Sequence, residues 1–293
     1  MTASINLNSA ALLIIMLLIF AACGKTVKTS SGPEPDPPVK NATKVLFFAT
    51  SMNTAFIDIP GIFRLLSIRG GSAVEVTAVK NGSYNQHLNS SASMALLNTK
   101  QWDYVVLTEN TLIVSSEERC AAEMYPAART LDSLIQTRGA RTVFYLHNAY
   151  GDDYISQYLD LEIDGHWELQ QLLTSGYTGI ADELNAMICP VGTACGIAKS
   201  EYRDQFQEEL DLWAWDNIHP NMETAYLAAC VLFAVIFKES PEGINFLGRT
   251  ASIQGAGIQT YDLEISRAAF FQRIAAETVL SEPERWNLDL NNG

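Results

Sequence analysis

The sequence predicts an α/β domain in which a parallel β-sheet is covered by helices on both faces. Short apolar segments alternate along the chain with longer segments whose apolar residues recur at helical spacing. That alternation is typical of parallel sheets joined by crossover helices. The 293 residues suffice for one such domain with a sizeable core, and neither an internal repeat nor a second linker divides them.

Each predicted strand is a short run rich in Val, Phe, Leu or Ile, residues that pack well in a buried sheet. The predicted strands cover residues 44–49, 73–79, 104–107, 142–146 and 187–191. The predicted helices cover residues 59–68, 92–98, 117–138, 169–187 and 222–237, and an amphipathic helix is expected near 263–280. Residues 148–167 are polar and aromatic, and they are expected to form a lid or substrate loop.

The amino terminus has the features of an export signal. Residues 1–22 contain no charged side chain, and the apolar run 10–20 is shorter than the roughly 20 residues of a membrane span. The motif Phe20-Ala21-Ala22-Cys23 resembles a bacterial lipobox, which implies that Cys23 is lipidated and becomes the mature terminus. An uncleaved signal anchor is the alternative interpretation.

The segment that follows Cys23 is rich in Ser, Thr, Pro and Gly and predicts a flexible tether. The expected organisation is therefore a signal peptide over residues 1–22, a lipidated tether over 23–40 and one domain over 41–293. Such a protein would be exported and lipid-anchored to a bacterial cell membrane, facing the periplasm or the outer surface.

Charge and cysteine content exclude several classes of partner. The net charge is −14, so nucleic acid is not an expected partner, and acidic polysaccharides and anionic membrane surfaces are disfavoured at long range. The four histidines are far apart and no zinc-finger spacing occurs, so neither a metal nor a cofactor is expected. Cys189 and Cys195 bracket a short predicted loop. The sequence is compatible both with a disulfide between them and with two buried free thiols.

The stretch Asp216-Asn217-Ile218-His219-Pro220 carries the strongest chemical signal. A histidine that acts as a general base needs a partner that fixes its tautomer, and Asp216 lies three residues before His219. The candidate nucleophile is Ser51, which directly follows the apolar run of the first predicted strand. The carboxyl edge of a parallel sheet is where open α/β domains bind their ligands, so Ser51 is expected there.

Four blocks together resemble the SGNH (GDSL-type) ester hydrolases, in family order, over roughly residues 44–240. The blocks are Ala49-Thr50-Ser51, Asn81-Gly82-Ser83, Thr108-Glu109-Asn110-Thr111 and Asp216-Asn217-Ile218-His219. The resemblance implies a flavodoxin-like three-layer α/β/α sandwich. It also implies a Ser51, His219 and Asp216 triad, and an oxyanion hole formed by the N–H groups of Ser51 and Gly82 and the Asn110 side-chain amide.

The chain departs from the family at the nucleophile block and after the block asparagine. Ala49 and Thr50 stand where glycine and an aspartate or asparagine are usual, and Thr111 stands where many members have aspartate. Alanine adopts positive φ less cheaply than glycine, so the turn into Ser51 is expected to differ slightly.

The resemblance implies hydrolysis of a small acyl ester, with acetyl on a carbohydrate as the expected substrate. The alternatives are an acyltransferase on the same site and a carbohydrate-binding lipoprotein on a decayed scaffold. His87, His147 and Trp215 are further candidates for the substrate pocket. A solvated His87 and a Trp215 used only for packing are the competing interpretations. His166 is expected at the surface, and Glu109 is expected to face outward or to cap a loop.

Overall fold

The computed structural model describes residues 41–159, 163–246, 251–253, 257–259 and 263–289. Cys23, with the predicted signal peptide and tether, lies outside these residues. The described chain forms a five-stranded sheet in the order β2-β1-β3-β4-β5, in which every neighbouring pair is parallel. Its strands are β1 (Thr43–Ala49), β2 (Val74–Lys80), β3 (Tyr104–Leu107), β4 (Arg141–Tyr145) and β5 (Met187–Cys189). The predicted parallel α/β architecture is confirmed.

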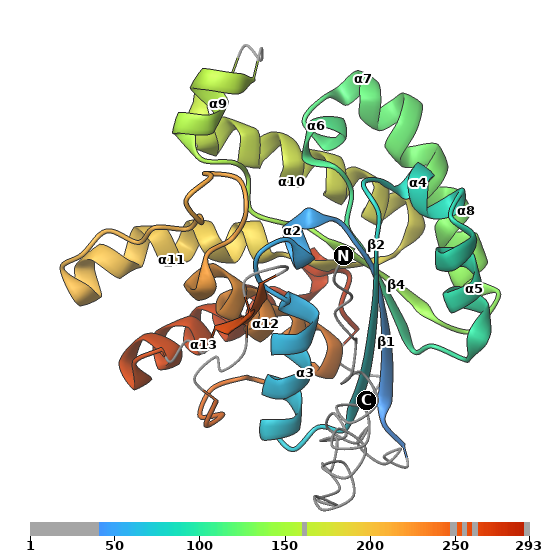
Figure 1. Ribbon diagram of the computed structural model, residues 1–293. Coiled ribbons are helices and arrows are strands. Elements are labelled where there is room, and N and C mark those ends of the chain that lie inside the picture. Colours follow the sequence, from blue (N-terminus) through green and yellow to red (C-terminus); the bar gives the residue numbers. More distant parts are fainter. Residues whose placement is uncertain (1–40, 160–162, 247–250, 254–256, 260–262, 290–293) are drawn as a thin grey trace, which may run out of the picture. The chain divides into compact units, whose positions relative to one another are not determined.

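Helices cover both faces of this sheet, with α3, α12 and α13 on one side and α5 and α8 on the other (Figure 1). The longer helices are α3 (Ile59–Arg69), α5 (Ser91–Thr99), α8 (Tyr125–Gln136), α10 (Gly165–Leu184), α11 (Val191–Phe206), α12 (Met222–Phe237) and α13 (Ile265–Leu280). The shorter ones are α2 (Ser51–Thr54), α4 (Tyr84–Leu88), α6 (Thr111–Val114), α7 (Glu117–Arg119), α9 (Asp152–Tyr158), a π-helical turn (Cys120–Met124) and a 3₁₀ turn (Pro283–Trp286). A small antiparallel pair joins β6 (Ala251–Ile253) and β7 (Gly257–Gln259).

Helix α12 is the most deeply buried helix and begins directly after the candidate base. Its amino terminus is capped by Asn221, whose side chain accepts a hydrogen bond from the Thr224 N–H at 3.0 Å. Almost every later side chain is buried, because α3 and α13 pack against it. A helix that is apolar on all sides belongs in a core or a membrane. None of the described helices combines the length and hydropathy needed to cross a bilayer.

Three segments differ from the sequence-based prediction. Helix α11 was not predicted, and the helix expected over residues 117–138 is interrupted by the π-helical turn at Cys120–Met124. The expected lid at 148–167 contains α9 and the start of α10. Cys189 ends β5 while Cys195 lies inside α11, and both thiols are free and buried. The buried-thiol alternative therefore holds, and the disulfide does not form.

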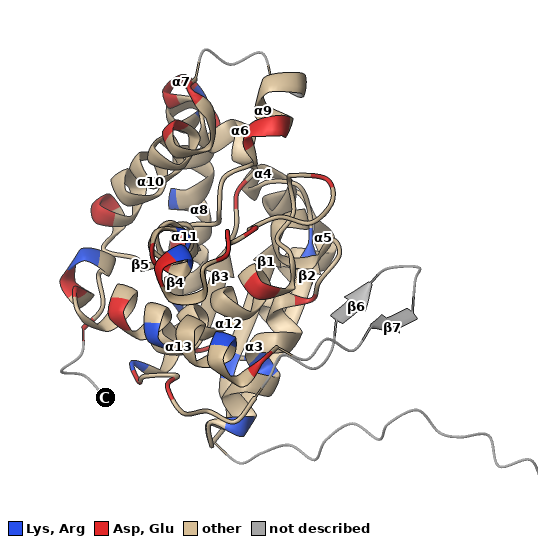
Figure 2. Ribbon diagram, turned by 90° about the vertical axis from the view of Figure 1, so that its left-hand side faces the viewer, with Lys and Arg blue, Asp and Glu red and all other residues tan. Residues whose placement is uncertain are grey.

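The strand register brings the candidate residues to one edge. Ala49 pairs with Lys80 across β1 and β2, and Phe48 pairs with Leu107 across β1 and β3. Segments that follow these strands therefore meet at the carboxyl edge of the sheet, where ligands bind in open α/β folds. Figure 2 shows acidic and basic residues interspersed along the surrounding helices, without a basic stretch along any described helix.

Candidate active site

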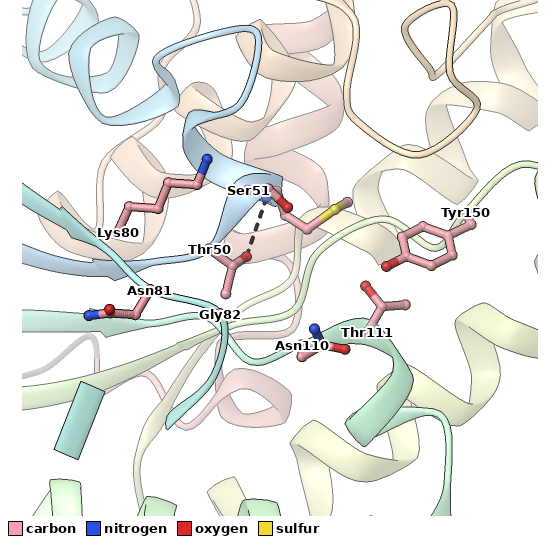
Figure 3. Close-up of a pocket in the computed structure, with 9 residues that line it drawn as sticks. Thr50, Ser51, Lys80, Asn81, Gly82, Asn110, Thr111 and Tyr150 are labelled. Carbon is pink, nitrogen blue, oxygen red and sulfur yellow. Dashed lines mark hydrogen bonds between the residues drawn. The ribbon is translucent and has the colours of Figure 1, made fainter. Parts of the chain in front are cut away.

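A pocket of about 420 Å³ opens at this edge, within the size range of small-molecule sites. Three of the four sequence blocks contribute to its wall, and the strand and loop residues beside them complete it (Figure 3). Its lining consists of Thr50, Ser51, Met52, Lys80, Asn81, Gly82, Asn110, Thr111 and Tyr150. The structure thus places the predicted nucleophile, glycine block and asparagine block in one cavity.

Ser51 is held at the start of α2 by a capping arrangement around Thr50. The Thr50 hydroxyl accepts a hydrogen bond from the Met52 N–H at 3.3 Å, and the Asn53 side chain accepts one from the Thr50 N–H at 3.2 Å. Threonine is among the residues that cap helices well, so Thr50 serves as a cap where aspartate or asparagine is usual. Ala49 is the last residue of β1 and has no positive φ, so the alanine imposes no strain on the turn.

Asp216 organises the loop that carries His219. Its Oδ2 lies 2.6 Å from His219 Nδ1, while its Oδ1 accepts hydrogen bonds from the N–H groups of Ile218 at 3.1 Å and His219 at 3.0 Å. Asn217 adopts a left-handed conformation between them, with φ of 56°. Burial alone would raise the pKa of Asp216, but these hydrogen bonds outweigh it and lower the pKa. Asp216 therefore remains ionised and fixes the imidazole ring.

The other ring nitrogen of His219, Nε2, has no hydrogen-bond partner among the described residues. Nε2 is buried, and none of the described residues forms a hydrogen bond with it, Ser51 included. The imidazole ring packs against the edge of Phe56, with ring centroids 5.0 Å apart, and Phe56 follows α2 directly after the nucleophile segment. His219 is not among the residues that line the pocket. The contact between Ser51 and His219 therefore stays a prediction.

The side-chain amide of Asn110 is oriented by its own helix. Asn110 caps α6, and its Oδ1 accepts a hydrogen bond from the Leu112 N–H at 2.9 Å. With the oxygen engaged, the NH₂ group is the part of the amide left to donate, and Figure 3 shows it on the side facing Ser51. A fixed neutral donor beside the nucleophile is the arrangement that stabilises an oxyanion.

The second predicted oxyanion donor, the Gly82 N–H, already has a partner. It donates to Oε1 of Gln86 at 2.7 Å, and a Cβ at Gly82 would lie 2.6 Å from that oxygen. Gln86 belongs to the first turn of α4, where the Ser83 hydroxyl also accepts from its N–H at 3.3 Å. The Gln86 side chain is exposed. Rotation of that side chain into solvent would release the Gly82 N–H for a ligand oxygen.

Glu109 lies beneath this part of the pocket and ties two of its loops together. Its carboxylate accepts hydrogen bonds from the Asn110 N–H at 2.7 Å and from the Tyr84 N–H at 3.1 Å, and its own N–H donates to the Tyr177 hydroxyl at 2.9 Å. Burial raises the pKa of Glu109 to about 7, although the hydrogen bonds from Asn110 and Tyr84 oppose that shift. The expectation that Glu109 faces outward is wrong, and the loop-capping alternative is confirmed.

No protein-family model and no curated protein matches the chain. Among solved structures, a protein of the DUF4886 family from Bacteroides uniformis matches with a TM-score of 0.61 and 14% identity, over 83% of this chain and 96% of that one. A candidate SGNH hydrolase from Slackia heliotrinireducens matches with a TM-score of 0.51 and 21% identity, over 66% of this chain and 97% of that one. The chain has the SGNH-hydrolase fold. At these identities the likeness establishes the fold, and the chemistry of the site rests on the residues described above.

Two of the histidines considered for the pocket belong instead to the interior of the domain. His87 is fully buried, stacks on Phe48 with ring centroids 4.6 Å apart, and uses Nε2 to bond the Ala49 carbonyl at 3.2 Å. His147 is buried beside Tyr177. Burial lowers the pKa of both histidines to about 4, so both are neutral near pH 7. Neither lines the pocket, and His87 acts on the site by holding the end of β1.

The aromatic residues near the base divide into packed and exposed ones. His166 is buried between Trp167 and Trp213, so its expected surface position is wrong. Trp213 donates a hydrogen bond from its indole to the Ala149 carbonyl at 2.9 Å, which makes it a packing residue. Trp215 differs, because it is 85% exposed. Its ring centroid lies 5.6 Å from that of Phe56, the residue that contacts His219. It forms an aromatic rim beside the base.

Sequence reasoning did not single out Lys80, Tyr150 or Phe56 as site residues. Tyr150 lies in the segment expected to be a lid, and its hydroxyl faces Thr111 across the pocket (Figure 3). Lys80 ends an edge strand, where lysine is common, and Phe56 follows an unpredicted turn of helix. The one feature of the sequence that indicates Lys80 is its position at the end of a predicted strand, next to the glycine block. No groups of His, Cys, Asp or Glu suited to hold a metal ion occur within the described ranges.

Proposed function

We propose that this protein is a serine ester hydrolase that removes small acyl groups, with acetyl groups on carbohydrates as its substrates. The observation that supports it most is the 2.6 Å bond between Asp216 and His219 next to a cavity that contains Ser51 and the Asn110 amide. A tautomer-fixed imidazole, a serine at a strand end and a positioned amide donor are the parts that acyl transfer needs.

In the proposed reaction, Ser51 Oγ attacks the ester carbonyl carbon and its proton passes to Nε2 of His219. The Asn110 NH₂ group and the Ser51 N–H donate to the tetrahedral oxyanion, joined by the Gly82 N–H once Gln86 has turned away. Collapse of this intermediate expels the alcohol, which takes the proton from His219 and leaves an acyl-serine. Water then attacks the acyl group while His219 accepts its proton. His219 returns that proton to Ser51 Oγ as the acyl–serine bond breaks, which releases the acid and restores both residues.

The proposal requires His219 Nε2 to reach Ser51 when an ester is bound. Hydrogen bonds between nucleophile and base are often long in free enzymes and shorten in the substrate complex. A buried nitrogen without a partner is an unfavourable state, so a hydroxyl brought within reach would be bonded readily. Phe56 contacts the His219 ring directly, so we expect its side chain to move when the imidazole approaches Ser51.

Trp215 and Phe56 support a sugar as the alcohol part of the substrate. The exposed indole and the phenyl ring form an apolar surface beside His219, and the flat face of a sugar ring packs well on such aromatic groups. The pocket of about 420 Å³ has room for a small acyl group together with part of the alcohol. The combination favours a small acyl ester carried on a glycan.

Replacing Trp215 with alanine tests this substrate class. We expect the ratio of kcat/KM for acetylated xylo-oligosaccharides to kcat/KM for ethyl acetate to fall about three- to tenfold, the value of one aromatic contact. The matched control is Trp167→Ala, which removes another partly exposed tryptophan that does not line the pocket. An unchanged ratio argues against a glycan at this rim. Acetyl transfer to added sugar without release of acetate would favour the acyltransferase alternative.

We further propose that the protein is exported and anchored to a bacterial membrane through lipid on Cys23, as the motif Phe20-Ala21-Ala22-Cys23 suggests. Cys23→Ser is expected to leave an unprocessed precursor that no longer partitions into the detergent phase. Intact-mass measurement of the mature wild-type protein gives the direct test. A mature mass without lipid on Cys23 rules the anchor out.

A further inference from the structure

The active-site pocket has one ionic side chain in its wall. Eight of its nine lining residues are neutral, and Lys80 is the exception. Lys80 is the last residue of β2 and pairs in register with Ala49, two residues before the nucleophile. Its side chain extends toward the helix that begins at Ser51 (Figure 3). Lys80 is an exposed residue, so its flexible side chain lies at the rim of the pocket, where it can meet the part of a substrate that projects from the cavity.

This ammonium group has no carboxylate partner in the described part of the chain. The ion pairs among the described residues engage other basic side chains, including Lys100, which pairs with Glu75 of the same strand β2. The described residues also offer no hydrogen-bond acceptor to the Lys80 ammonium. Lysine on an edge strand commonly serves to discourage strand pairing, but that role does not require a place in a pocket wall.

We propose that Lys80 selects esters that carry a carboxylate close to the scissile bond, such as an acyl group on an acidic sugar. This inference rests on the proposed ester hydrolysis at Ser51 and names its substrate more closely. An unpaired ammonium at the rim of a pocket gains a charge-assisted hydrogen bond when a carboxylate binds beside it. The neutral groups that surround it offer that anion no repulsion from within the pocket wall.

The overall charge of −14 acts against an anionic substrate only at long range. Charges separated by more than about 8 Å are largely screened at physiological ionic strength. A contact between Lys80 and a bound carboxylate is shorter than that and is screened less. Net charge and local selectivity can therefore have opposite signs in the same protein.

The test compares two aryl esters that differ in one charge, 4-acetoxybenzoate and 4-acetoxybenzamide. For the wild type and each variant, the ratio of kcat/KM for the anionic ester to that for the neutral ester is measured. We expect Lys80→Gln to lower this ratio about two- to fivefold, the value of one solvent-exposed ion pair, and Lys80→Arg to preserve most of it. Differences in leaving-group reactivity cancel because both esters are used with every variant.

The matched control is Lys100→Gln, which removes the same charge from the neighbouring surface without touching the pocket. It should leave the ratio at the wild-type value. Equal ratios in wild type, Lys80→Gln and Lys100→Gln overturn the inference while ester hydrolysis itself stands. An equal fall in both glutamine variants also overturns it, because long-range charge would then explain the effect. If the wild type hydrolyses neither ester, the proposed function fails and this inference fails with it.

Discussion

Ser51→Ala and His219→Ala should each reduce kcat/KM for an aryl acetate by roughly 10⁴-fold or more. The two residues act as one unit, because the serine hydroxyl is a weak nucleophile until the imidazole removes its proton. The double variant should therefore be hardly less active than either single one. Asp216→Asn should cost less if its remaining oxygen still bonds the N–H groups of Ile218 and His219.

Steady-state kinetics with purified variants measures these losses, and circular dichroism confirms that each variant is folded. Ser133→Ala, at an exposed position of α8, is the control for loss of a serine hydroxyl elsewhere. If folded Ser51→Ala retains wild-type turnover, the serine mechanism is wrong. A wild type that hydrolyses no ester would make the carbohydrate-binding alternative the better account. Additive losses in the double variant would show that Ser51 and His219 act separately.

Asn110→Ala should lower kcat by roughly 10²–10³-fold with little change in KM, because the amide donates only to the charge that develops in the transition state. The same substitution removes the cap of α6, which is worth about 1 kcal/mol of stability. Asn110→Ser separates the two effects. Serine still caps the helix but has no amide donor, so this variant should keep most of the stability and lose most of kcat.

Thermal unfolding and kcat measured side by side on both variants decide the role of Asn110. Full activity in Asn110→Ser would mean that the cap, not the donor, is what the site requires. Loss of activity in proportion to loss of stability would lead to the same conclusion. Only a fall in kcat at preserved stability supports an oxyanion donor.

The sheet and its edge were predictable because local sequence determines them. Runs such as Val105 to Leu107 are short, apolar and flanked by polar residues, so they read directly as buried strands. Helix α12 was predicted with its observed bounds, since its residues are apolar on every side. The Asp216–His219 bond was also predictable, because both partners sit in one short loop.

Other features were not predictable because they depend on contacts between distant residues or on weak local patterns. The role of His87 is set by its bond to Ala49, which is 38 residues away. Glu109 is buried because Tyr84 and Asn110 offer it their N–H groups, and no local pattern indicates that. Helix α11 carries glycines at 192 and 196 and few large apolar residues, so its helical periodicity is faint.

The departures at Ala49 and Thr50 lose their significance once the local structure is known. Thr50 caps α2, and Ala49 keeps an ordinary strand conformation, so the nucleophile turn forms without glycine or aspartate. The relation between Ser51 and His219 is different, because it depends on how the loop of residues 211–220 sits beside Phe56. Local sequence identifies Ser51 and His219 as candidates, but the distance between them depends on the tertiary structure.

The central claim is that Ser51 is a nucleophile activated by His219, and covalent labelling with a fluorophosphonate tests it most directly. The labelled protein is digested and the modified peptide is identified by its mass. We expect one phosphonyl group, located on Ser51, in the wild type, and no label in Ser51→Ala or in folded His219→Ala. Labelling of a different serine, or an unlabelled wild type under conditions that label a reference serine esterase fully, would contradict the account.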